Sequence, residues 1–196
     1  MHVPQRFGCD FRLVDAEGEV LRPTGTTNLI NSQFYSYGAD VIAVSDGRVA
    51  KTEDGIPENV PRIDGKVITP IPLTDKTNAG NMVALEIGKG QYAFYAHLQP
   101  GSLRVKVGDR VRKGQLLGKL GNSGNSVGPH LHFHVSRGPE LNGHDFLPHV
   151  YSSYWLFGYE RDRKSDPAKR WRMDLKRRRI DFRVPTDGAF MTFPSK

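Results

Sequence analysis

The sequence predicts a mostly β protein, and three observations lead to this fold class. Gly contributes 21 and Pro 13 of the 196 residues, a content typical of a chain with many tight turns. Short runs of alternating apolar and polar residues recur between these turns, as in half-buried strands. Apolar residues make up 37% of the chain, which is enough to build a hydrophobic core. No window approaches the roughly 18 uninterrupted apolar residues of a spanning helix, so no transmembrane segment is expected.

The expected strands lie in four main parts of the chain, over residues 6–14, 41–51, 81–98 and 130–136. The segments SLRVKV and GDRVRKGQLLGKLGNSG, at 102–124, are expected to complete a dense β meander over 81–136. The second part contains two short runs around Asp46-Gly47, a dipeptide that favours a β-hairpin turn. In the third part, two runs are joined by a turn that contains two glycines, and in the fourth, histidines alternate with apolar residues. The stretch before the third part is expected to be a loop or an insertion.

Helix is expected mainly in the C-terminal third, as short helices over 153–162 and 167–179. We therefore divide the chain into a β domain, 1–150, and an aromatic and basic extension, 151–196. Within the extension, residues 161–179 hold ten Lys or Arg against three Asp, which accounts for the whole formal net charge of +7. This segment is either a solvated face or a contact for an anionic polymer, and no nucleic-acid partner is expected.

The single cysteine, Cys9, excludes an intrachain disulfide framework and a metal site built from several thiolates. The first five residues show neither the basic n-region nor the apolar h-region of a signal peptide, so none is expected in this chain.

Three of the seven histidines alternate along one expected strand, at His130, His132 and His134. Side chains two positions apart in a strand point to the same face, so the three imidazoles should lie together. Burying them without partners would be costly, whereas zinc binds imidazole nitrogen and carboxylate oxygen and activates water for hydrolysis. With His97 on a neighbouring strand, the pattern indicates a candidate metallohydrolase site. A structural cluster of hydrogen-bonded histidines is the alternative.

Six segments of the chain resemble, in order and spacing, the motifs of the lysostaphin- and LytM-type zinc endopeptidases that cut peptidoglycan. They are R-F-G-C-D-F at 6–11, A-V-S-D-G-R-V-A at 43–50, Y-A-H-L at 95–98, V-G-D-R-V-R-K-G-Q at 107–115, G-N-S-G-N-S at 121–126 and G-P-H-L-H-F at 128–133. The resemblance covers roughly residues 6–150.

The resemblance implies a compact antiparallel β fold, a sandwich or half-barrel with a groove, that uses one Zn²⁺ to hydrolyse peptide bonds in peptidoglycan cross-links or stems. Carried over by motif, Asp10 and His132 correspond to zinc ligands. His97 and His130 correspond to the pair that activates water and stabilises the oxyanion. His134 lies beyond the motif and is interpreted as supporting the site or as structural. An extracytoplasmic location is also implied.

One departure affects the metal site. The family's first ligand lies four residues before the aspartate, where this chain has Arg6, and a guanidinium has no lone pair to offer a metal. Three interpretations follow. His2 supplies the missing nitrogen, or His134 or His97 is recruited. Alternatively, the domain is catalytically degenerate and binds cell-wall peptide or a protein partner.

The segment VKVGDRVRKGQLLGKL also resembles the half-barrel of biotinyl and lipoyl carrier domains. Those domains carry a modifiable lysine at a hairpin tip. The best turn here, Asp46-Gly47-Arg48, has no lysine at its tip, which disfavours the carrier interpretation.

Overall fold

A computed structural model describes residues 7–23, 28–62, 66–159, 177–183, 185 and 189–193. The chain divides into two compact units. Unit 1 comprises the described parts of Met1–Leu13 and Leu21–Leu147, and unit 2 those of Val14–Val20 and Pro148–Lys196.

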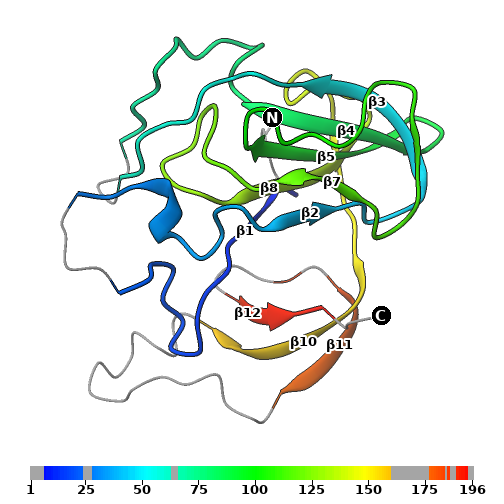
Figure 1. The fold of residues 1–196 in the computed structure, drawn as a ribbon. Helices are drawn as coiled ribbons and strands as arrows, with labels where there is room; N and C mark the ends of the chain where they lie inside the picture. Colours follow the sequence, from blue (N-terminus) through cyan, green and yellow to red (C-terminus); the bar gives the residue numbers. More distant parts are fainter. Residues whose placement is uncertain are drawn as a thin grey trace. The chain divides into compact units, whose positions relative to one another are not determined.

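Unit 1 is built on a seven-stranded antiparallel sheet with the order β1-β8-β5-β4-β3-β6, to which β9 is added beside β8 (Figure 1). Its strands are β1 (Cys9–Phe11), β3 (Gly47–Glu53), β4 (Asn81–Gly88), β5 (Gln91–Leu98), β6 (Arg110–Val111), β8 (Leu131–Ser136) and β9 (Phe146–Leu147). A second sheet pairs β2 (Asp40–Ile42) with β7 (Leu116–Lys119). The predicted mostly β, antiparallel fold class is confirmed.

The centre of the sheet is also the centre of the core. Strands β4 and β5 form the predicted hairpin, and Gly90 in its turn has φ +64°, a conformation that glycine adopts without steric cost. Five of the eight residues of β4 are buried in succession, and so are six in β5. Apolar residues therefore fill both faces here, including Val83, Leu85 and Phe94.

The predicted hairpin at 41–51 is wrong in its pairing, although both runs form strands. Strand β2 pairs with β7, whereas β3 pairs with β4 and β6. A Cβ on Gly47 would lie 2.7 Å from the backbone oxygen of Glu86, so the glycine permits close approach to β4. Asp46 accepts a hydrogen bond from the backbone N–H of Lys113. Asp46 and Gly47 thus make contacts with distant segments, and these contacts outweigh the local preference of Asp-Gly for a hairpin turn.

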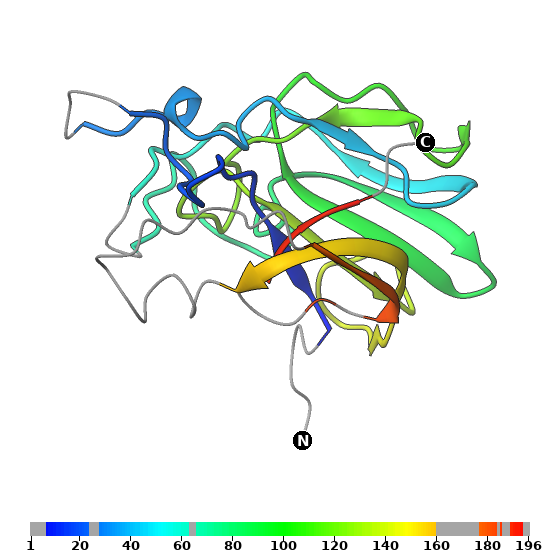
Figure 2. The same cartoon turned by 90° about the horizontal axis from the view of Figure 1, so that it is seen from below.

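Strand β1 is short, but its pairing with β8 places the end of the R-F-G-C-D-F motif, Cys9–Phe11, beside the strand that carries His132 and His134. Cys9, Asp10 and Phe11 are register partners of Phe133, His132 and Leu131. Figures 1 and 2 show the two strands side by side, although most of the chain separates them in sequence.

Unit 2 contains a three-stranded antiparallel sheet with β10 (Tyr151–Tyr159) between β11 (Arg178–Arg183) and β12 (Ala189–Thr192). The predicted helix over 153–162 is wrong for 153–159, which belong to β10. Tyr154 and Leu156 are buried while Ser153, Trp155 and Phe157 are partly exposed, which is the alternation of a strand. β structure therefore does not end near residue 150.

The second predicted helix, 167–179, lies outside the described residues up to 176, and its last two residues begin β11. Helix in the described residues is limited to the 3-10 turn Asn31–Gln33, so its expected location in the C-terminal third is wrong there. Among these residues no helix has the length and apolar content needed to cross a membrane.

Candidate functional site

Five side chains singled out from the sequence meet at β8 and its two neighbours in unit 1. β8 lies between β1 and β5, which places Asp10 opposite His132 on one side and Ala96 opposite His132 on the other. The five residues are Asp10 on β1, His97 on β5, His130 just before β8, and His132 and His134 on β8.

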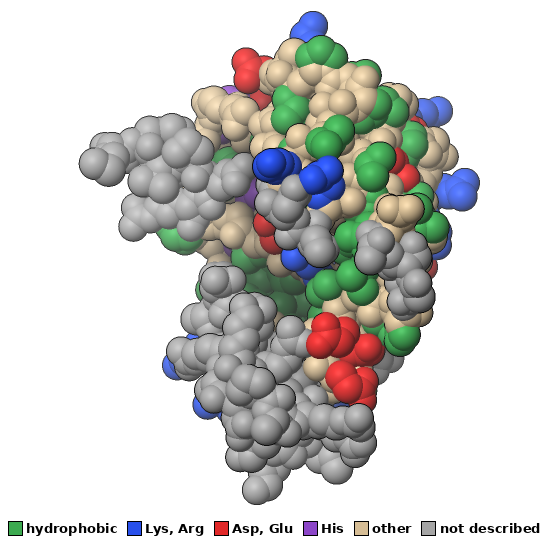
Figure 3. Space-filling view, turned by 90° about the vertical axis from the view of Figure 1, so that its left-hand side faces the viewer, with side chains coloured by type: hydrophobic (Ala, Val, Ile, Leu, Met, Phe, Trp, Pro, Cys, Tyr) green, Lys and Arg blue, Asp and Glu red, His purple; other side chains and the backbone are tan. Residues whose placement is uncertain are grey.

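Asp10 and His132 form the closest polar contact of this group. His132 Nδ1 lies 2.9 Å from Asp10 Oδ1, and the Asp10 side chain is 57% exposed while that of His132 is 7% exposed. The contact therefore joins a nearly buried imidazole to a carboxylate that solvent can reach. Figure 3 shows little histidine surface on the face that it displays, in keeping with the burial of His97, His130, His132 and His134.

His97 takes an unusual backbone conformation, with φ +63°. The pairing of β4 with β5 shifts register between Asn81 and Val83, opposite this region, as at a β-bulge. The His97 ring lies 2.8 Å from the carbonyl oxygen of Ser123 through Nδ1, so Nδ1–H donates and Nε2 keeps its lone pair. Bulges and left-handed residues re-aim side chains at functional sites, and this one directs His97 toward His130.

His130 repeats this arrangement. Its Nδ1 lies 2.9 Å from the carbonyl oxygen of Gly128, so Nδ1–H donates there and Nε2 keeps its lone pair. Nε2 is 3.8 Å from Asp10 Oδ2. The His97 and His130 ring centroids are 4.7 Å apart. The site thus presents two imidazoles that are both oriented by backbone carbonyls.

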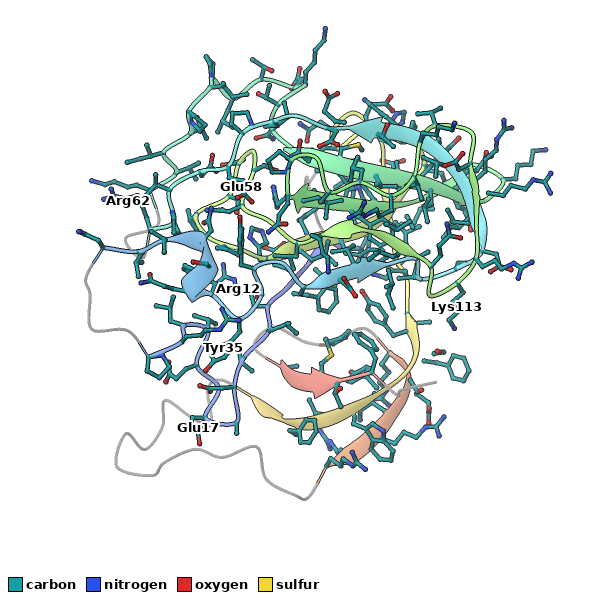
Figure 4. All side chains as sticks on the ribbon, in the orientation of Figure 1. Arg12, Glu17, Tyr35, Glu58, Arg62 and Lys113 are labelled. Carbon is teal, nitrogen blue, oxygen red and sulfur yellow. The ribbon has the colours of Figure 1, made fainter. Side chains whose placement is uncertain are left out.

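The electrostatics keep these two imidazoles neutral and the carboxylate charged. Burial, with a smaller effect of the neighbouring imidazoles, lowers the pKa of His97 to about 3. Burial also lowers the pKa of His130, although the Asp10 carboxylate opposes this, and Arg12 (Figure 4) lowers it further. Partial burial acts to raise the pKa of Asp10, but the His132 hydrogen bond and the nearby imidazoles lower it to about 2.

His134 is fully buried beside this cluster, with its Nδ1 3.0 Å from His132 Nε2. It extends the line of imidazoles from His132 into the core.

A buried polar network that the sequence did not reveal holds the loop 121–126 in place. Glu58 (Figure 4) accepts the backbone N–H of Asn122, and Asn59 Nδ2 donates to the carbonyls of Gly124 and Ser126. Ser123, whose carbonyl binds His97, lies in the same loop. Isolated polar residues 64–67 positions upstream carry no pattern, so only the tertiary structure identifies them.

Two sequence-predicted residues, His2 and Arg6, lie outside the described residues. Within the described ranges, no group of three or more His, Cys, Asp or Glu side chains is arranged to hold a metal ion. Asp10 and His132 are a carboxylate and an imidazole, two donor types that zinc binds.

Comparison with protein-family models gives one match, to the family described as peptidase family M23, over residues 32–145. The match covers more than half of the chain. It includes the four histidines of the site and does not include Asp10.

Curated relatives match shorter stretches. The chain is 40% identical over 65 residues to a peptidoglycan DD-endopeptidase of Vibrio cholerae, covering 33% of this chain and 15% of that protein. It is 32% identical over 101 residues to a glycyl-glycine endopeptidase of Staphylococcus capitis, covering 51% of this chain and 22% of that protein. The chain thus spans less than a quarter of either relative's length.

Among solved structures, the catalytic domain of lysostaphin from Staphylococcus simulans matches with a TM-score of 0.39 and 23% identity. That match covers 66% of this chain and 86% of the lysostaphin domain.

Proposed function

The chain belongs to peptidase family M23, and on this basis we propose that it is a zinc-dependent endopeptidase that hydrolyses peptide bonds of peptidoglycan. Two relatives are named as peptidoglycan and glycyl-glycine endopeptidases, which supports peptide cross-links or stems of the cell wall as substrate. An extracytoplasmic site of action follows from that substrate.

The observation that carries the proposal is the contact between Asp10 and His132 beside two neutral imidazoles. A carboxylate oxygen and an imidazole nitrogen 2.9 Å apart can both approach one cation at the roughly 2.0–2.2 Å usual for zinc. The donor types fit zinc. His2 remains our candidate for the third ligand, because Arg6 cannot coordinate a metal.

Zinc bound by Asp10 and His132 would supply Lewis acidity that lowers the pKa of a water molecule toward neutrality. Within this chain, the Nε2 lone pair of His97 or His130 can accept the proton of the attacking water. The imidazolium so formed presents an N–H that can stabilise the oxyanion or protonate the leaving amine. The Ser123 and Gly128 carbonyls hold the two rings in orientation throughout, and the Asp10 carboxylate stabilises a positive charge on His130.

The test combines metal content with hydrolysis. Zinc in the purified chain is measured by plasma mass spectrometry, and peptides released from purified peptidoglycan are measured with chelator and after zinc is restored. We expect Asp10→Ala and His132→Ala to lose zinc and activity. His144→Gln, which changes a partly exposed histidine paired with Glu140, serves as the matched control and should retain both.

A parent protein that binds no zinc, or that binds zinc and releases no peptide, would overturn the proposal. Co-sedimentation of that protein with peptidoglycan would then support the second function, a degenerate domain that binds cell-wall peptide.

A further inference from the structure

His134 occupies a position where an apolar side chain would be expected. Its ring is stacked between the phenyl rings of Phe94 and Phe146. The ring centroids are 4.7 Å apart for Phe94, with an interplanar angle of 14°, and 3.8 Å apart for Phe146, with an interplanar angle of 12°. The register of the sheet produces this arrangement, because Phe94 is the β5 partner of His134 and Phe146 pairs with Ser136 from β9. The side chain is completely buried.

Burial of a polar ring between two aromatic rings costs free energy unless the ring uses its hydrogen-bonding atoms. One of those atoms, Nδ1, lies 3.0 Å from His132 Nε2. The other nitrogen of the His132 ring, Nδ1, faces Asp10 at 2.9 Å. The three side chains therefore form a row in which His132 is held from both sides.

A neutral imidazole carries one N–H, so the hydrogen bond on one nitrogen decides what the other nitrogen can do. When His134 Nδ1 accepts a proton from His132 Nε2–H, the lone pair of His132 is on Nδ1 and points toward Asp10. When His134 Nδ1–H donates instead, His132 carries its proton on Nδ1 and donates it to the carboxylate. Both arrangements keep the two rings neutral, but only the second makes the contact with Asp10 a hydrogen bond. In the first, two acceptors face each other, and a cation between them is needed to hold them together.

We propose that His134 is a positioning residue that fixes the ring of His132 and supports the tautomer with a free Nδ1 lone pair for the metal. The inference rests on the proposed function. Stacking on Phe94 and Phe146 fixes the orientation of the His134 ring. The contact of His134 Nδ1 with His132 Nε2 in turn fixes the orientation of the His132 ring. A group hydrogen-bonded to the far nitrogen of a ligating histidine is worth about 10–100-fold in metal affinity.

Two variants separate positioning from packing. His134→Leu fills the slot between the phenyl rings without a polar atom, whereas His134→Gln keeps a group that can donate or accept. We expect His134→Leu to weaken zinc binding by about 10–100-fold, measured by competition with a chromophoric chelator, and His134→Gln to restore most of the loss. Circular dichroism and thermal melting confirm that both variants fold.

A second readout does not depend on zinc binding. In the metal-free protein, the nitrogen chemical shifts of the His132 ring report its tautomer by NMR. We expect His134→Leu to change those shifts and His134→Gln to preserve a hydrogen-bonded Nε2. Unchanged His132 shifts in a folded His134→Leu variant, or unchanged zinc affinity, would overturn the inference. If the parent binds no zinc, the proposed function fails and the NMR result alone decides the role of His134.

Discussion

The carboxylate of Asp10 lies 2.9 Å from Nδ1 of His132, although 122 positions separate the two residues in the chain. The pairing of β1 with β8 creates this contact by placing the two residues directly opposite each other. Sheet register thus brings a carboxylate and an imidazole into contact from the two ends of the β domain's sequence.

The first prediction concerns His97 and His130, whose rings are oriented by hydrogen bonds to backbone carbonyls. His97→Ala and His130→Ala should each lower kcat by about 10²–10⁴-fold while zinc content stays at the parental level, because their proposed role is proton transfer and oxyanion stabilisation. Zinc content and peptide release are measured on the same preparations. Loss of zinc from either folded variant would instead make that histidine a ligand.

A second prediction concerns pH and the hydrogen bond from the Tyr37 hydroxyl to Glu58, which is 2.6 Å long. Burial, followed by the Glu58 carboxylate, raises the pKa of Tyr37 from 10.0 to about 12. Since the folded-state pKa is the higher one, the stabilisation is complete below pH 10 and is lost as the pH rises from 10 toward 12.

Tyr37→Phe removes this pH-dependent contribution. Urea unfolding should show the variant less stable than the parent by about 1 kcal/mol at pH 8, with the gap closing as the pH approaches 12. Parallel stability curves for parent and variant across this range would show that the pair does not contribute.

A third prediction tests the close packing of the loop 121–126, whose Ser123 carbonyl binds His97, by comparing two glycines of similar backbone conformation. Gly124 (φ +75°) has no space for a Cβ, which would lie 2.3 Å from the backbone nitrogen of Gly80, whereas a Cβ on Gly90 (φ +64°) would have no neighbour within 4 Å. Gly90→Ala should cost about 1 kcal/mol of unfolding free energy through backbone strain, and Gly124→Ala clearly more through overpacking. Equal losses in chemical denaturation would contradict this account.

The basic segment 161–179 leads to the fourth prediction, that it carries most of the binding to anionic polymers. Truncation from residue 161 would also remove β11 and β12, the partners of β10. Charge neutralisation is therefore the better test. Lys169→Gln, Arg170→Gln and Lys176→Gln together should lower the salt concentration needed for elution from heparin. The same substitutions made at Lys66, Lys76 and Lys113 in unit 1 serve as the control, and equal shifts would refute the prediction.

The amino-acid sequence by itself determined the fold class and most of the candidate site. Alternation of His130, His132 and His134 with apolar residues is a local property, and a strand has no other way to present them than on one face. The order of the short motifs along the chain was likewise sufficient to indicate the family.

Tertiary structure alone decided how these local elements were combined. Asp46-Gly47 has the chemistry of a hairpin turn, but pairing of β3 with β4 and β6 took precedence. Residues 151–159 became a strand because β11 and β12 pair with it from either side. The left-handed backbone of His97, the stacking of His134 between two phenyl rings and the approach of Asp10 to His132 all arise from contacts between distant segments. Such contacts depend on strand register and packing, which no window of neighbouring residues encodes.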